Sequence, residues 1–175
     1  MEQSDLLRVL VRAIDAIGLR YFITGSSATI FYGKPRFTND IDVVVDGEPI
    51  DLAGTVTYRG MMFTGVPNLA WTFGYFRVSW TLRADLISDL VCRLLNHLDG
   101  LGARQVTPRL RPEDAGMPIL PWFDPENFNP GYMMRSIDRL PRRGDQPEWQ
   151  HSQDYWAEKD LFRSADLDDG CLIYD

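Results

Sequence analysis

Apolar residues recur at helical spacing near the start of the chain and predict a helix that Ser4 caps and Gly18 ends. The positions that define it are Leu6, Leu7, Leu10, Val11 and Ile14. A short apolar strand at 21–23 follows, and Gly25-Ser26-Ser27 then opens a second short helix. Residues 40–45 are interpreted as a buried strand with two acids near its start. The first 45 residues therefore predict a short α-β-α-β unit.

The pattern changes after Gly47. Residues 56–58 and 61–63 are predicted strands, and the aromatic run 68–75 is predicted to be another. A long helix is predicted from Ser79 or Thr81 to about Asp99. Its apolar stripe consists of Leu82, Leu86, Leu90, Val91, Leu94 and Leu98. Residues 46–102 thus predict a strand–long-helix unit.

The last third of the chain, residues 103–175, is rich in proline and in charged residues, so it cannot form one regular element. It also contains many aromatic residues, which disordered tails lack. We interpret it as an irregular arm that wraps over a larger body. The whole chain is therefore expected to be mixed α/β, with parts at 1–45, 46–102 and 103–175.

Charge and cysteine content exclude some classes of protein. The net charge of −7 argues against a protein that binds a nucleic-acid backbone. Cys92 and Cys171 lie far apart and give neither a zinc motif nor a disulfide framework, and Cys92 is expected to be a buried structural thiol. The N-terminus lacks the features of a signal peptide, and no apolar run is long enough to span a membrane. A cytoplasmic protein is expected.

The first candidate site combines a phosphate-binding turn with two acids. Gly25 and Ser26 follow a strand and begin a helix, where free N–H groups and the helix dipole favour negative charge. Asp40 and Asp42 alternate along a strand and share one face, where they can bind Mg²⁺. The same residues also suit a plain turn and a solvated strand end.

This order of motifs resembles nucleotidyltransferases of the AbiEii and toxin–antitoxin type over roughly residues 5–45. The resemblance implies that Ser26 contacts nucleotide phosphate and that Asp40 and Asp42 bind metal. The family normally needs a third carboxylate on a later strand, and the sequence has no clear candidate for it. An incomplete site is expected.

A second resemblance covers about residues 46–175. The segments Ser79-Trp80-Thr81-Leu82-Arg83-Ala84-Asp85-Leu86 and Pro130-Gly131-Tyr132 occur in an ordered series with Arg135-Ser136-Ile137-Asp138 and Gly144-Asp145. The series resembles the C-terminal part of Baeyer–Villiger monooxygenases. This resemblance implies FAD and NADPH as cofactors and a small molecule as substrate.

In such flavoproteins the N-terminus of a late helix faces the flavin, where reduction leaves negative charge. The resemblance therefore nominates Ser79, Trp80 and Thr81 as flavin-proximal in an intact enzyme. The preceding turn departs from the family, because Phe76-Arg77-Val78 stands where the family more often has small or polar residues. The Gly-x-Gly-x-x-Gly turn that binds a dinucleotide is absent from the 175 residues, so the chain alone is not expected to bind FAD or NADPH tightly.

Three interpretations follow. The first is a monooxygenase fragment, inactive without the body of its parent enzyme and fused to a foreign N-terminal segment. The second is a small Mg²⁺-dependent nucleotidyltransferase that uses Ser26, Asp40 and Asp42. The third is a fragment without chemistry that serves an interaction. The dinucleotide turns separate the first two, because only a flavin enzyme needs them.

Overall fold

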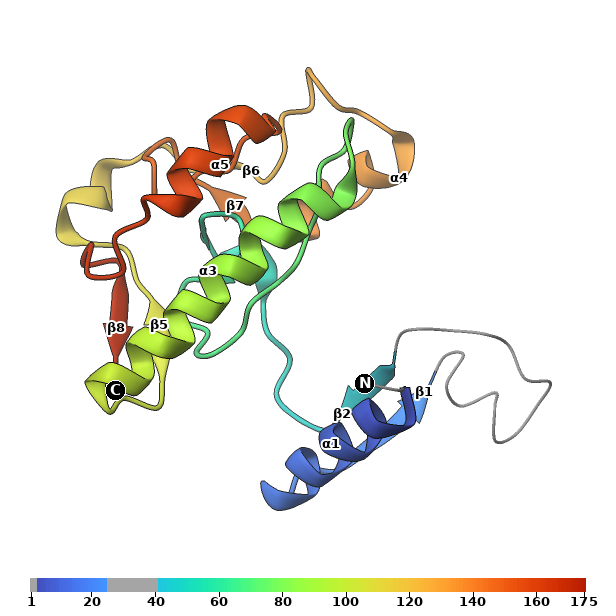
Figure 1. The fold of residues 1–175 in the computed structure, drawn as a ribbon. Coiled ribbons are helices and arrows are strands. Elements are labelled where there is room, and N and C mark those ends of the chain that lie inside the picture. Colours follow the sequence, from blue (N-terminus) through green and yellow to red (C-terminus); the bar gives the residue numbers. More distant parts are fainter. Residues whose placement is uncertain (1–2, 25–40) are drawn as a thin grey trace. The chain divides into compact units, whose positions relative to one another are not determined.

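The computed structural model describes residues 3–24 and 41–175, which divide into two compact units, Met1–Ile50 and Asp51–Asp175 (Figure 1). The described elements are helices and small antiparallel sheets, which confirms the expected mixed α/β class.

The first unit contains helix α1 (Gln3–Ala16) and the antiparallel strands β1 (Tyr21–Thr24) and β2 (Asp42–Val45). The chain leaves α1 through Gly18, whose φ of 71° suits glycine. The prediction of a buried strand at 40–45 was wrong: in β2 only Val43 is even half-buried. Among the described residues β2 pairs with β1 alone, in a two-stranded sheet. The predicted second helix lies outside the described residues.

The second unit is built from short strands and helices around one long helix. Its strands are β3 (Thr57–Tyr58), β4 (Met62–Phe63), β5 (Val106–Pro108), β6 (Leu120–Pro121), β7 (Arg142–Arg143) and β8 (Leu172–Tyr174). They pair antiparallel as β3 with β4, β5 with β8, and β6 with β7. Its helices are α3 (Trp80–Leu101), α4 (Gly131–Met134) and α5 (Tyr155–Arg163), with 3₁₀ turns η1 (Leu52–Gly54), η2 (Pro112–Gly116) and η3 (Ile137–Arg139).

Helix α3 crosses the middle of this unit (Figure 1). The predicted stripe is present: Leu86, Leu90, Leu94 and Leu98 are buried in the core. The expectation that Cys92 is buried was wrong, because it is exposed. Cys92 follows Leu90 by two residues, and because a helix has 3.6 residues per turn, it lies on the opposite side of α3 from the buried Leu90.

The aromatic run 68–75 is not a strand. Asn68 has a φ of 53°, in the left-handed region, and its side-chain amide bonds Val106 N–H and the Arg104 carbonyl beside its own backbone bond to the Val106 carbonyl. The aromatic side chains pack in a cluster instead: Trp71 and Phe73 lie 5.0 and 4.6 Å from Trp122 between ring centroids. The run is therefore held by this packing and by isolated backbone bonds, such as that from Trp71 N–H to the Met61 carbonyl.

The proline-rich segment packs on the long helix. Its residues Val106, Met117, Trp149, Phe162 and Leu172 belong to the same buried cluster as the leucines of α3. Helix α5 is capped at both ends: the Asp154 carboxylate accepts from two backbone N–H groups, and Arg93 of α3 donates to three carbonyls after Leu161. The segment thus completes the core of the second unit.

A buried ion pair joins α3 to α5. Arg83 is 1% exposed and Glu158 is 2% exposed. Arg83 Nε donates to Glu158 Oε2 at 3.0 Å, and its terminal nitrogens donate to the Phe73 and Arg59 carbonyls at 2.9 Å. The hydroxyl of Tyr75 also donates to Glu158, at 2.7 Å. One guanidinium therefore connects four separate segments of the unit.

We predict that Arg83→Met lowers the free energy of unfolding by about 3–5 kcal/mol, because it leaves the Glu158 carboxylate buried without its cation. Urea unfolding followed by far-UV circular dichroism measures the change. Asp138→Asn is the matched control, since it removes an exposed partner of Arg142 and should leave stability unchanged. Equal stability of Arg83→Met and the parent chain would contradict this account.

Candidate functional site

The three residues nominated as flavin-proximal lie together at the start of α3. Ser79 is the N-cap residue, although its side chain makes no capping bond, and its hydroxyl lies 2.8 Å from that of Thr81. Trp80 is 48% exposed and packs on Gly74, where an added Cβ would lie 2.2 Å from the indole. The first turn contains no acidic residue. This end of α3 is therefore open to a negatively charged group.

Of the nucleotidyltransferase-like residues, only Asp42 lies within the described part of the chain. It is exposed and stands opposite Thr24 in the β1–β2 register. Gly25, Ser26 and Asp40 lie outside the described residues. Across residues 3–24 and 41–175, no three His, Cys, Asp or Glu side chains are grouped so that they could hold a metal ion.

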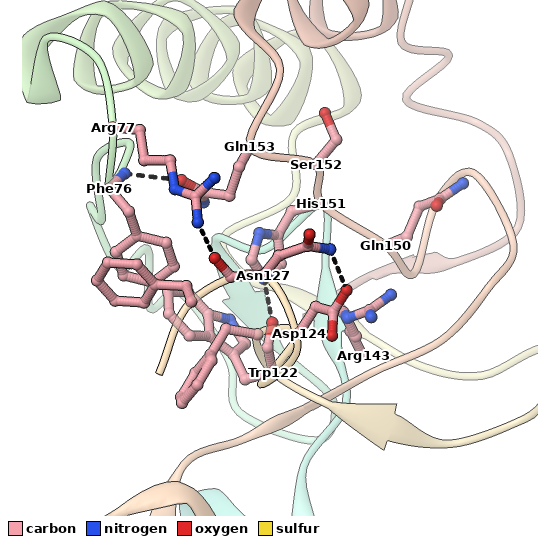
Figure 2. Close-up of a pocket in the computed structure, with 12 residues that line it drawn as sticks. Phe76, Arg77, Trp122, Asp124, Asn127, Arg143, Gln150, His151, Ser152 and Gln153 are labelled. Carbon is pink, nitrogen blue, oxygen red and sulfur yellow. Dashed lines mark hydrogen bonds between the residues drawn. The ribbon is translucent and has the colours of Figure 1, made fainter. Parts of the chain in front are cut away.

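A cavity of about 410 Å³ opens beside the turn that precedes α3 (Figure 2). Aromatic rings form much of its wall. Phe76 stacks on Phe128 with centroids 3.9 Å apart, and both rings contact Phe123 edge-on. Trp122, which is fully buried, and His151 complete the wall. Strand β6 leads directly into Trp122-Phe123, and this connection positions the two rings.

His151 is the buried titratable group of this cavity. Its ring lies 4.6 Å from that of Trp122, and Nε2 lies 2.6 Å from the Trp122 carbonyl. Burial, together with the positive charge of Arg83, lowers the pKa of His151 to about 3. His151 packs closely against Gly60, where an added Cβ would lie 2.8 Å from His151 Cβ. His151 is therefore a neutral imidazole at physiological pH.

The mouth of the cavity contains paired polar groups (Figure 2). Gln153 accepts from the backbone N–H of Phe76 at 2.7 Å. Arg77 donates to the Asn127 carbonyl, and the Asn127 side chain donates to Asp124. These bonds join the turn before α3 to the loops at 122–128 and 150–153.

Sequence reasoning missed this cavity. It treated residues 76–78 only as a departure from the family, and it nominated neither Trp122 nor His151. One signal was present: His151 is one of only two histidines in the chain, and it follows a tryptophan-containing segment. Phe76 and Arg77, which line the cavity, lie in the turn that leads directly to the nominated residues Ser79–Thr81.

The chain resembles curated monooxygenases over most of its length. It is 43% identical over 151 residues to FAD-containing monooxygenase EthA of Mycolicibacterium smegmatis, a match that covers 86% of the chain and 28% of the relative. It is 41% identical over 130 residues to the protein of that name from Mycobacterium tuberculosis, and 33% identical over 131 residues to a probable FAD-binding monooxygenase, AlmA, of Acinetobacter baylyi. About three quarters of this chain is thus homologous to FAD-containing monooxygenases.

The chain spans about a quarter of the length of the curated relatives it matches. A match over three quarters of the chain necessarily includes its middle, where α3 lies. No protein-family model matches the chain, and no solved structure matches it. In the described part of the chain, the helices are too short or too polar to cross a lipid bilayer.

We predict that His151 makes the second unit sensitive to acid. The folded state lowers the pKa of His151 from 6.5 to about 3, so the unfolded chain takes up the proton first as pH falls. The contribution of the neutral His151 ring to the free energy of unfolding is complete above pH 6.5, and it is lost between pH 6.5 and about pH 3. Stability should fall by up to about 1.4 kcal/mol per pH unit in this window.

The measurement is urea unfolding from about pH 7 to about pH 4.5, a window in which histidine titrates in the unfolded chain. His151→Leu lacks the titrating group, so the difference in stability between the parent and this variant should shrink as pH falls. A difference that stays constant across this range would contradict a buried neutral imidazole.

Proposed function

We propose that residues from about 46 to 175 are the C-terminal portion of an FAD- and NADPH-dependent monooxygenase of the Baeyer–Villiger type, and that they act only with the remainder of such an enzyme. The observation that carries this proposal is the 43% identity to 28% of the EthA protein. In the proposed chimera a foreign N-terminal segment that lies within residues 1–45 precedes this portion.

The residues present suit one end of FAD. The first turn of α3 exposes Ser79, Trp80 and Thr81 and has no carboxylate, and its helix dipole favours the negative charge of a reduced flavin ring. FAD, when bound, would supply the oxygen chemistry. The sequence lacks the Gly-x-Gly-x-x-Gly turn that would bind the ADP half of FAD, and it lacks a second such turn for NADPH. The proposal therefore assigns α3 a role in facing the flavin, with the dinucleotide turns supplied by the parent enzyme.

A graft tests this assignment. Residues 51–175 replace the matching quarter of the M. smegmatis relative, and flavin absorbance and ketone-dependent NADPH oxidation are measured. We predict that the purified chain alone is colourless, because it lacks the dinucleotide turn, whereas the graft retains flavin and oxidises NADPH. A stoichiometric flavin spectrum from the chain alone would contradict the proposal, as would a folded graft that retains no flavin.

Thr81→Asp in the same graft tests the position of the flavin. A carboxylate at the first turn of α3 should disfavour the negatively charged reduced flavin and lower its reduction potential. Asn96→Asp adds the same charge to an exposed position farther along α3 and serves as the control. Equal potentials in the two variants would remove Ser79–Thr81 from the flavin site.

One observation favours a second function for the first unit, nucleotidyl transfer. The β1–β2 register pairs Asp42 with Thr24, the residue that precedes Gly25 and Ser26 in the sequence, so an acid lies at the end of β1 from which the chain continues to these two residues. In this alternative Gly25 and Ser26 contact phosphate, and Asp40 and Asp42 bind Mg²⁺.

We predict that transfer from a labelled nucleoside triphosphate in the presence of Mg²⁺ is undetectable, because the third carboxylate of such sites has no clear candidate in the sequence. Asp42→Ala is the control for any signal that appears. Transfer that Asp42→Ala abolishes would show a working nucleotidyltransferase and overturn the prediction.

A further inference from the structure

A second cavity, of about 190 Å³, is lined by the β3–β4 turn and by one face of α5. Arg59 of the turn and Glu158 of α5 contribute the charged part of its wall. It shares residues 150–152 with the aromatic cavity of Figure 2, and none of Ser79, Trp80 and Thr81 lines it. This cavity is therefore independent of the proposed position of the flavin. The apolar part of the wall consists of Pro147, Ala157, Leu161 and Phe162.

Arg59 is a buried cation without a carboxylate partner among the described residues. It is 7% exposed, and none of the ion pairs in the described part of the chain includes it. Nε has no hydrogen-bond partner, and Nη1 makes a single bond, 3.4 Å long, to the Leu161 carbonyl. Nη2 makes no hydrogen bond in this part of the chain, and unlike Nε it is not covered by protein atoms. Nη2 is therefore the nitrogen that a molecule in the cavity can reach.

The other charged group of the wall is already engaged. Glu158 accepts from Arg83 with one carboxylate oxygen and from the backbone of Ser152 with the other, so this ion pair is neutral as a whole. His151 adds no charge, because burial lowers its pKa to about 3. A buried charge is costly unless it is paired and hydrogen-bonded. The wall thus carries one uncompensated positive charge, on Arg59.

The turn itself does not account for an arginine at this position. Arg59 has a φ of 47°, in the left-handed region, which glycine, asparagine and aspartate adopt more readily. The ring of Tyr58 lies 5.3 Å from the guanidinium carbon and supplies only a cation–π contact in place of a counter-ion. The guanidinium, rather than the backbone conformation, is therefore the feature that calls for a partner.

The chemistry of the wall selects a carboxylate among small anions. A guanidinium fork matches the two oxygens of a carboxylate, and one positive charge matches one negative charge. Phosphate and sulfate have further oxygens, which the apolar part of this wall would leave without donors. That part of the wall suits an alkyl chain instead. The volume lies below the range of about 300–1,000 Å³ that is typical of drug-sized ligands, so the chain must be short.

We propose that this cavity binds a small carboxylate with a short apolar chain, and that Arg59 pairs with its carboxylate group. Leu161 and Phe162 pack against the chain. Two sources offer this chemistry: a free short-chain carboxylate, and a glutamate side chain from the remainder of the parent enzyme.

Titration of the full chain with butyrate tests the proposal, followed by backbone amide signals in NMR spectra at constant ionic strength. The signals of Ala157 and Leu161, which line the cavity, should shift and saturate, whereas that of Leu98 in α3 should not move. Arg59→Met should weaken butyrate binding at least about tenfold, because it removes the charged donor. Arg163→Met removes the same charge from an exposed position of α5 and should bind butyrate as the parent does.

Two further ligands test the parts of the proposed carboxylate. Butyramide has a shape close to that of butyrate without its charge, so it should bind at least about tenfold more weakly. Formate keeps the charge without the alkyl chain, and it should also bind more weakly than butyrate. Equal affinity for butyrate and butyramide, equal binding by Arg59→Met and the parent, or the lack of a saturable shift would overturn the proposal. The ligand comparisons use the parent chain and hold even where Arg59→Met fails to fold.

The graft of residues 51–175 distinguishes the two sources, and only this comparison rests on the proposed function. Butyrate binding that persists in a flavin-loaded graft assigns the cavity to a free carboxylate, and its loss there assigns the cavity to a glutamate of the remaining enzyme. A folded graft without flavin contradicts the proposed function alone, because the titration of the chain by itself does not depend on the graft.

Discussion

The second unit depends on one buried cation. A guanidinium removed from water is costly unless it is paired and hydrogen-bonded, and Arg83 donates to three acceptors on three different segments. Glu158 in turn accepts from Arg83, from Tyr75 and from the backbone of Ser152. Each of these partners must be in place before the ion pair is satisfied. The network therefore joins α3, α5, the β3–β4 turn and the aromatic segment 68–75 into one cooperative body.

The same network builds the wall of the aromatic cavity. The β3–β4 turn, which binds Arg83 through the Arg59 carbonyl, places Gly60 against His151. Ser152, held by Glu158, follows His151 in the chain and fixes the backbone on its other side. Phe73, whose carbonyl also accepts from Arg83, packs edge-on against Trp122. The side chains of Trp122 and His151 are thus positioned by an ion pair that does not line the aromatic cavity itself.

The sequence predicts those features that depend on periodicity and on family resemblance. The stripe at Leu86, Leu90, Leu94 and Leu98 predicts α3, and the ordered motifs after residue 46 predict the relation to FAD-containing monooxygenases. The sequence does not reveal Arg83 as a core residue, because a charged side chain on a helix is normally solvated. The cavity depends on contacts between segments far apart in the chain, such as His151 with Trp122, and no local pattern encodes them.

Native-state hydrogen exchange of the full chain is the most direct test of the central claim that residues 51–175 form one body around Arg83. The amides of Ser152, Trp71 and Arg59, which bond Glu158, Met61 and Glu148, should exchange with the same opening free energy as those of Leu90 and Leu94 in α3. Exchange of Ser152 and Trp71 that is orders of magnitude faster than that of α3 would contradict the claim, because it would show that these segments open independently of the helix.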